Sequence, residues 1–184
     1  AALTGIAQEF PWSVIDDLRI LAIDIEGHAR ALHCEALPDD VAARLPAQRA
    51  ALARTRCAVI TLSDRAANGV YEDKSGALLA RIVSDAGGSL VHQLVLPDDG
   101  ERLAIEVEVL SRRGDIDVLV CTGGTGIGPR DITPETLLRL GIRPIPGIGE
   151  LLRAHSANVV RSAWLSRSVA GTLGTMIVIA LPGS

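Results

Sequence analysis

The chain has 184 residues, enough for one domain with a substantial core and an additional segment. Hydrophobic residues make up 48% of it but aromatic residues only 2%, so we expect an aliphatic core, as in a buried parallel sheet covered by helices. The formal net charge of −4 provides no strongly basic surface, which argues against nucleic-acid binding. No apolar run reaches membrane-spanning length, and Cys34, Cys57 and Cys121 are too widely spaced for a zinc pattern. We therefore expect a reduced, cytoplasmic setting without membrane association.

Residues 1–54 differ from the rest of the chain and are interpreted as an N-terminal appendage of unknown role. Their composition favours a strand over 18–25 and an Ala- and Arg-rich helix over 41–54, interrupted near Pro46. The chain starts at Ala1 rather than Met, which is expected either if residues precede it or if an initiating Met is removed by processing.

From Cys57 onward, predicted strands alternate with predicted helices. Short apolar runs predict strands over 57–62, 90–96, 118–121 and 175–181. Helical spacing predicts helices over 74–85 and 100–113, from 133 onward and over 147–160, with Thr133 as an N-cap and Pro134 in the first turn. This alternation predicts one three-layer α/β/α domain over 55–184, with a mostly parallel central sheet.

A glycine-rich loop, TGGTG at 122–126, directly follows one of the predicted strands. In open α/β sheets, ligands bind beyond the carboxyl ends of the strands. Three glycines allow the backbone to approach a ligand closely, and their N–H groups can bind an anion. The spacing matches neither a Walker A loop nor the dinucleotide pattern. The loop therefore predicts a phosphate or pterin site, with a purely structural turn as the alternative.

Several further motifs accompany this loop in a fixed order. They are VITLSDR at 59–65, GVYEDKSG at 69–76, LPDD at 96–99, PRDITPE at 129–135, PGIGE at 146–150, LSR at 165–167 and LPG at 181–183. Together with TGGTG they resemble the MogA/MoaB family of molybdenum cofactor biosynthesis, which is related to the gephyrin G domain. The resemblance covers about 56–184 and implies the molybdopterin-binding type of α/β fold.

The resemblance implies a nucleotidyltransferase, molybdopterin adenylyltransferase, which joins AMP from ATP to the terminal phosphate of molybdopterin and releases pyrophosphate. The attacking phosphate is already anionic, so the reaction needs alignment and charge neutralisation by Mg²⁺ and backbone donors rather than a His or Cys base. By family position, Asp98 and Asp131 are the catalytic and Mg²⁺-binding carboxylates. The alternative is a turn role for both, and Asp99 competes with Asp98 for the position.

The same resemblance implies a set of substrate-binding residues. They are Ser63, Asp64, Thr122, Gly123, Gly124, Thr125, Gly126, Thr133, Glu150, Ser166 and Arg167. Ser63 and Asp64 would line the nucleotide side, while Glu150 and Ser166 would contact the pterin. Arg167 has the geometry to bind a phosphate with two nitrogens, with a surface ion pair as the alternative. Asp73 precedes a predicted helix, where capping competes with ligand contact.

Family members are homotrimers or hexamers, and a molybdate insertase is the implied protein partner. They also continue into a terminal helix after the LPG motif, so we expect residues beyond Ser184. The spelling LPGS resembles MoaB-like members more than MogA. The alternative function is therefore a non-catalytic MoaB-like protein that binds molybdopterin or acts as a scaffold.

Overall fold

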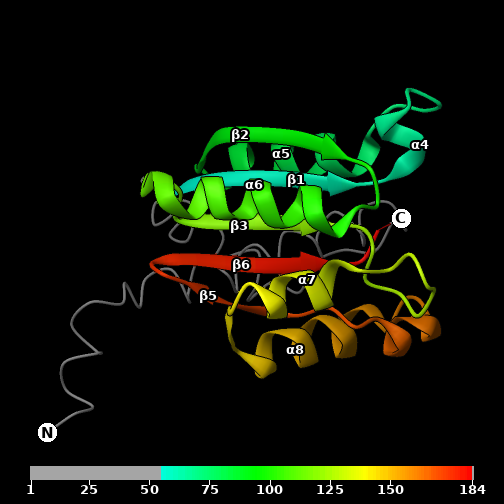
Figure 1. Cartoon of the computed structure of the whole chain (residues 1–184). Helices are drawn as coiled ribbons and strands as arrows, with labels where there is room; N and C mark the ends of the chain where they lie inside the picture. The colour runs from blue at the N-terminus through cyan, green and yellow to red at the C-terminus, as the bar shows by residue number, and fades with distance from the viewer. Residues whose placement is uncertain (1–54, 184) are drawn as a thin grey trace, which may run out of the picture. The chain divides into compact units, whose positions relative to one another are not determined.

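The computed structural model describes residues 55–183, which contain a six-stranded sheet (Figure 1). The strands lie in the order β2-β1-β3-β6-β5-β4. Three central strands are parallel: β1 (Arg56–Leu62), β3 (Val118–Thr122) and β6 (Met176–Leu181). On one side β2 (Ser89–Leu96) pairs with β1. On the other side the strands are antiparallel to their neighbours: β5 (Ala170–Leu173) to β6, and β4 (Arg143–Pro144) to β5.

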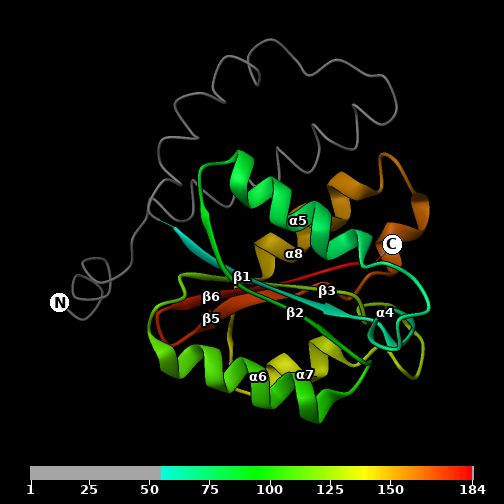
Figure 2. The same ribbon diagram turned by 90° about the horizontal axis from the view of Figure 1, so that it is seen from above.

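Helices connect these strands and cover both faces of the sheet. In chain order they are α4 (Asp64–Ala67), α5 (Lys74–Asp85), α6 (Gly100–Arg113), α7 (Thr133–Arg139), α8 (Pro146–Ser156) and the 3-10 helix η2 (Arg161–Leu165). Figure 2 shows α6 and α7 on one face, and α8 with the first turns of α5 on the other. The predicted three-layer α/β/α fold is confirmed, as is the mostly parallel sheet.

The core between the sheet and α6 is aliphatic. Leu103, Val107 and Leu110 follow each other at helical spacing and are fully buried. They pack in one cluster with Leu119 and Val178 from the central strands. Complete burial of such a side chain contributes roughly 1.5–3 kcal/mol, so this face fixes α6 firmly against the strands whose ends carry the glycine-rich loop.

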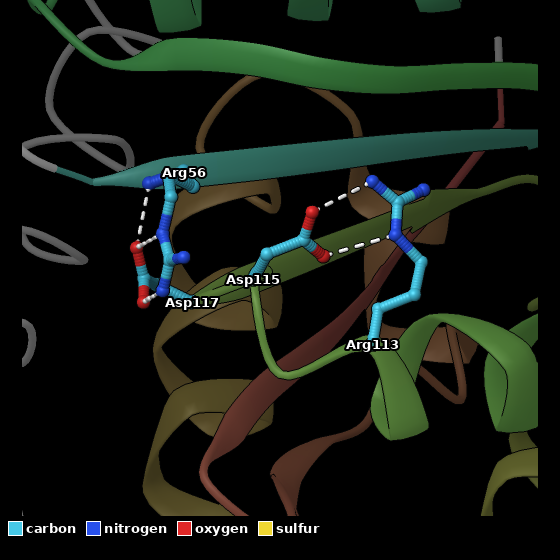
Figure 3. Close-up of polar contacts among 4 residues, drawn as sticks. All are labelled: Arg56, Arg113, Asp115 and Asp117. Atoms are coloured by element: carbon cyan, nitrogen blue, oxygen red, sulfur yellow. Dashed lines mark hydrogen bonds and ion pairs between the residues drawn. The ribbon is translucent and has the colours of Figure 1, made fainter.

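The amino-terminal ends of β1 and β3 are joined by an arginine–aspartate pair (Figure 3). Asp117 accepts hydrogen bonds from Arg56 Nε at 3.1 Å, from Arg56 Nη2 at 2.8 Å and from the Arg56 main-chain N–H at 2.7 Å. The guanidinium lowers the pKa of the Asp117 carboxyl below its ordinary value. A second and partly exposed pair joins Arg113 to Asp115 beside it. Both pairs stabilise the edge of the sheet that lies away from the glycine-rich loop.

The structure corrects several sequence predictions in this domain. The helix expected over 147–160 ends at Ser156, and η2 follows it. Thr133 is not an N-cap: Ile132 holds that position, and the Thr133 hydroxyl donates to the Gly123 carbonyl oxygen at 2.8 Å. The short strands β4 and β5 were not predicted, because neither contains a long apolar run.

The strand predicted over 18–25, the helix over 41–54 and the appendage as a whole lie outside the described residues. Within the described part, Arg56–Arg81 and the chain from Leu90 onward belong to one compact unit. The segment Ile82–Ser89, which contains the end of α5, belongs to a second unit. None of the described helices is both long and apolar enough to cross a membrane.

Candidate functional site

The glycine-rich loop begins where three parallel strands end side by side. Thr122, the last residue of β3, pairs with Thr61 of β1 and with Leu181 of β6. The Gly123 N–H donates to the Leu181 carbonyl oxygen at 3.2 Å, and the Thr122 hydroxyl donates to the Pro182 carbonyl oxygen at 3.1 Å. The predicted position of the loop at the carboxyl edge of the sheet is therefore confirmed, and Thr122 anchors the start of the loop.

Two glycines of the loop have backbone conformations that other residues rarely adopt. Gly123 has φ +101°, and a Cβ atom there would lie 2.2 Å from the Leu62 carbonyl oxygen. Gly124 has φ +63°, and its Cβ would lie 2.5 Å from the Thr133 hydroxyl. Thr133 is fully buried and also donates from its main-chain N–H to the Gly124 carbonyl oxygen at 3.0 Å. Thr133, the first residue of α7, therefore holds Gly123 and Gly124 in this turn by two hydrogen bonds.

Arg167 also binds this loop. Its main-chain N–H donates to the Thr125 carbonyl oxygen at 2.8 Å, and its Nε donates to the Gly126 carbonyl oxygen at 2.6 Å. Nη2 donates to the Asp131 carbonyl oxygen at 2.5 Å, and Nη1 forms an ion pair with Glu135. All three guanidinium nitrogens contact other groups of the protein. In this arrangement the Arg167 side chain holds the loop in position.

Two carboxylates, Asp64 and Asp98, are joined beside the loop, just after β1 and β2 end. The Asp64 N–H donates to Asp98 Oδ2 at 3.3 Å, and the Asp98 N–H donates in return to Asp64 Oδ1 at 3.1 Å. Arg130 forms an ion pair with Asp64. Burial raises the pKa of Asp98, and the negative charges of Asp64 and Asp131 raise it further, while the Asp64 N–H and the Arg130 charge oppose the shift. We call Asp64, Asp98 and Asp131 the acidic group: the first two are hydrogen-bonded to each other's backbone, and the charge of Asp131 has the weakest of these effects on the pKa of Asp98.

The glycines of the loop also make room for the Asp131 side chain. Asp131 Oδ2 accepts a hydrogen bond from the Gly128 N–H at 2.8 Å. A Cβ atom at Gly126 or Gly128 would lie 2.7 or 2.9 Å from this oxygen. The carboxylate therefore folds back against the loop that precedes it, and its position depends on the conformation of that loop.

A polar cluster connects the loop to α8 and to the serines that precede β5. The hydroxyl groups of Thr125 and Ser166 share a hydrogen bond of 3.3 Å, and those of Ser166 and Ser168 share one of 2.8 Å. Arg153 of α8 donates to the Ser168 carbonyl oxygen at 3.0 Å. Glu150 is exposed on the same helix, and its contact with the pterin stays a prediction. Ser168 is a member of this cluster that the sequence motifs did not indicate.

Capping explains the neighbouring polar residues. Ser63 caps α4 by accepting from the Ala66 N–H at 3.3 Å, and its hydroxyl shares a 2.7 Å hydrogen bond with that of Tyr71. Asp73 accepts from the Gly76 N–H at 2.9 Å at the start of α5. Asp99 caps α6, so it is Asp98 that faces Asp64. Capping accounts for the contacts of Ser63 and Asp99, whereas Asp73 Oδ2 is buried without a hydrogen-bond partner, and the nucleotide contact expected of Ser63 stays a prediction.

The donor chemistry of the acidic group suits a magnesium ion that is also held by phosphates. Among residues 55–183, no three His, Cys, Asp or Glu side chains are close enough to hold a metal ion by themselves. Mg²⁺ commonly takes one or two carboxylates and completes its shell with water and substrate phosphates. Asp98 and Asp131 fit that requirement, so a metal would have to arrive with its phosphate ligand.

Comparison with known proteins assigns the family. The model of the family described as "Probable molybdopterin binding domain" matches residues 58–184. The chain belongs to this family. The match begins in β1 and includes the glycine-rich loop and the acidic group, so the resemblance inferred from the ordered motifs is confirmed.

Individual members of the molybdopterin-binding family give the degree of similarity. A "Molybdenum cofactor biosynthesis bifunctional protein" of Synechococcus elongatus is 40% identical over 134 residues, which is 73% of this chain but only 42% of that protein. A "Molybdopterin adenylyltransferase" of Helicobacter pylori is 36% identical over 127 residues, which is 68% of this chain and 72% of that one. The crystal structure of MoaB from Thermus thermophilus superimposes with a TM-score of 0.66 at 30% identity, and covers 71% of this chain and 82% of that chain.

Proposed function

We propose that this chain acts in molybdenum cofactor biosynthesis as a molybdopterin adenylyltransferase. In this proposal the loop 122–126 binds molybdopterin, and the neighbouring acidic group positions Mg-ATP. The observation that carries the proposal is the reciprocal hydrogen bonding of Asp64 and Asp98 beside a glycine-rich loop at the carboxyl edge of the sheet. The name of the Helicobacter relative, a molybdopterin adenylyltransferase, agrees with it.

In the proposed reaction, an oxygen of the terminal phosphate of molybdopterin attacks the α-phosphorus of ATP. A new P–O bond forms, the bond to the β-phosphate oxygen breaks, and pyrophosphate leaves with the electron pair. The nucleophile is already an anion, so no side chain has to remove a proton from it. Burial raises the pKa of the Cys121 thiol to about 12, which excludes this residue as an alternative nucleophile at neutral pH.

The task of the protein in this reaction is alignment. The bracing contacts of Thr133 and Arg167 fix the loop before any substrate arrives, which reduces the reorganisation needed at the moment of reaction. Asp98 and Asp131 would hold the magnesium ion, which when bound supplies the positive charge that two approaching phosphates require. Ser166 and Thr125 offer hydroxyl groups on the pterin side of the loop.

The remaining expectations from the family belong to the same proposal. They are a cytoplasmic location, a homotrimeric or hexameric assembly and a molybdate insertase that receives the product. The alternative, a non-catalytic carrier of molybdopterin, uses the same loop but not the acidic group.

An ATP-dependent adenylylation assay tests the proposal. The purified chain is mixed with molybdopterin, ATP and Mg²⁺, and we expect adenylylated molybdopterin and pyrophosphate in equal amounts. Isothermal titration of molybdopterin and of Mg-ATP is run in parallel. If the chain binds molybdopterin but neither binds ATP nor forms product, the transferase proposal is wrong and the non-catalytic carrier is favoured.

A further inference from the structure

The loop that follows α4 folds back and returns Tyr71 to the end of β1. Gly69 has φ +68°, and after this turn the Val70 N–H donates to the Arg65 carbonyl oxygen at 2.8 Å. The Tyr71 hydroxyl then shares a 2.7 Å hydrogen bond with the hydroxyl of Ser63, and the Arg65 guanidinium carbon lies 5.0 Å from the centre of the Tyr71 ring. Contacts of the main chain and of two side chains therefore hold the tyrosine ring in a defined position.

This fixed ring is open to solvent. Tyr71 is 41% exposed, and because the Arg65 guanidinium covers one face of the ring, the opposite face is the one that a ligand can reach. Tyr71 and Trp164 are the aromatic residues within 55–183, and the core of this described part is built without either of them. An aromatic ring that is held in place without being buried is typical of a surface that binds a flat ligand.

Tyr71 stands on the nucleotide side of the proposed active site. Its hydrogen-bond partner Ser63 directly precedes Asp64, which is joined to Asp98 by two reciprocal hydrogen bonds. Figure 1 shows α4 and the loop after it beyond the ends of β1 and β2. The ring is therefore near the acidic group but not part of it. In ATP the ribose separates the base from the phosphates, so phosphates at the acidic group would leave the base free to reach a ring placed in this way.

We propose that Tyr71 is a stacking surface for the adenine ring of ATP, held in position by Arg65 and Ser63. This inference rests on the proposed function, because it takes the phosphates of ATP to lie at the acidic group. Stacking needs no hydrogen bond to the base, so Tyr71 contributes affinity for a purine ring rather than a choice between purines. A tyrosine that only stabilised its loop through the contact with Arg65 would affect every ligand of the site alike, which makes the two roles separable.

Direct contact between the tyrosine ring and the base tests the inference in the unaltered chain. Tyr71 is the single tyrosine of the protein, so in a sample deuterated except at tyrosine its ring signals are identified at once. We expect nuclear Overhauser effects between these ring protons and the H2 or H8 proton of adenine when Mg-ATP is bound. A contact with molybdopterin in place of ATP, or with neither ligand, would overturn the inference.

Binding measurements separate stacking from a structural role. Isothermal titration compares Mg-ATP with inorganic triphosphate and Mg²⁺, a probe that lacks the base. We expect Tyr71→Leu to weaken ATP binding roughly ten- to a hundredfold but triphosphate binding by less than about twofold. Tyr71→Phe keeps the ring and loses only the hydrogen bond to Ser63, so its affinity for ATP should stay within about threefold of the parent.

Val70→Ala is the matched control, because Val70 precedes Tyr71 in the same loop and is more exposed. It should bind ATP and triphosphate like the parent. Equal losses of affinity for the two ligands in Tyr71→Leu would give the side chain a structural role and overturn the stacking surface. A loss in Tyr71→Phe as large as that in Tyr71→Leu would show that the hydroxyl rather than the ring serves the nucleotide, and would overturn it as well. If Tyr71→Leu fails to fold, the Overhauser effects in the parent chain decide.

These outcomes are separable from those of the adenylylation assay. If no adenylylated product forms but the tyrosine ring contacts adenine and Tyr71→Leu loses affinity for ATP alone, the proposed reaction fails and the stacking surface stands. If product forms and Tyr71→Leu binds ATP like the parent, the stacking surface fails alone.

Discussion

Arg167 donates from Nη2 to the main-chain carbonyl oxygen of Asp131 at 2.5 Å, across 36 positions of the sequence. The same guanidinium reaches the Gly126 carbonyl oxygen at 2.6 Å through Nε. One side chain therefore joins the two ends of the segment that runs from the glycine-rich loop to the proposed catalytic carboxylate. The position of Asp131 depends on this brace as well as on its own backbone.

Arg167→Lys should reduce adenylyl transfer while leaving the fold intact. A lysine has a single nitrogen and cannot span two carbonyl oxygens, so the loop and Asp131 would lose their fixed separation. Displacement of a catalytic group by about 1 Å can cost roughly a hundredfold in rate, and we expect a fall in kcat of about ten- to a hundredfold. Steady-state kinetics with molybdopterin and Mg-ATP, together with the urea midpoint of unfolding, check the expectation.

Arg112→Lys provides the comparison for Arg167→Lys, because it makes the same change in an exposed ion pair on α6. It should leave both kcat and the midpoint unchanged. A full-rate Arg167→Lys enzyme would show that the brace has no influence on the reacting groups.

Gly123→Ala should destabilise the protein more than Gly141→Ala. Both glycines have positive φ, +101° and +80°, so alanine is strained at either position by about 1–2 kcal/mol. At Gly141 nothing lies within 4 Å of the added Cβ, whereas at Gly123 the Leu62 carbonyl oxygen lies 2.2 Å from it. Gly123→Ala must also shift β1 or the loop, and we expect a further loss of at least about 1 kcal/mol.

Chemical unfolding in urea measures both glycine variants, and titration with molybdopterin shows whether the loop still binds. Gly141→Ala should bind normally and Gly123→Ala weakly. Equal free energies of unfolding for the two variants would mean that the close approach of Gly123 to β1 is relieved without cost.

The sequence predicts well the parts of this fold that depend on local patterns. Long apolar runs and helical spacing identified β1, β3, α5 and α6, and the glycine-rich loop could be placed because it follows a buried strand. The antiparallel strands β4 and β5 escaped prediction, since two and four residues are too few to show a period.

Roles that depend on tertiary contacts could not be inferred in the same way. Both Arg130 and Arg167 belong to recognised motifs, yet Arg130 pairs with the carboxylate of Asp64 in α4, and Arg167 binds main-chain carbonyl oxygens of Gly126 and Asp131. Thr133 has the residue type and position of an N-cap, but its hydroxyl is directed to Gly123, ten residues earlier. In each case the role of the side chain depends on the group that it contacts, and that group becomes known only from the folded structure.

Asp131→Asn should abolish turnover but not molybdopterin binding. The amide keeps an oxygen that can accept from the Gly128 N–H, so the loop should retain its conformation while the negative charge is lost. We expect kcat to fall by roughly a hundredfold or more and the Kd for molybdopterin to change by less than about threefold. Asp115→Asn, at the opposite edge of the sheet, is the control and should match the parent enzyme. Retained turnover in Asp131→Asn would remove this carboxylate from the mechanism.

The Arg56–Asp117 pair gives the free energy of unfolding a predictable dependence on pH. The side-chain hydrogen bonds from Arg56 lower the pKa of Asp117 in the folded protein, whereas in the unfolded chain it returns to about 3.9. The unfolded state therefore binds more protons in acid. The stabilisation is complete above about pH 4 and is lost as the pH falls through the lower pKa of the folded state.

Asp117→Asn should accordingly lower the free energy of unfolding most near neutral pH, by about 1–2 kcal/mol. The reason is that charged hydrogen bonds from Arg56 are replaced by weaker ones. Urea unfolding at pH 7, 5 and 3 should show the difference between parent and variant shrinking at the most acidic point. Asp115→Asn changes the partly exposed pair with Arg113. The pKa of Asp115 is lowered like that of Asp117, so this variant should show an effect of the same sign that is smaller and is removed by added salt. A difference for Asp117→Asn that grows on acidification would contradict the assignment, because a depressed carboxyl pKa can only lose its contribution as protons are added.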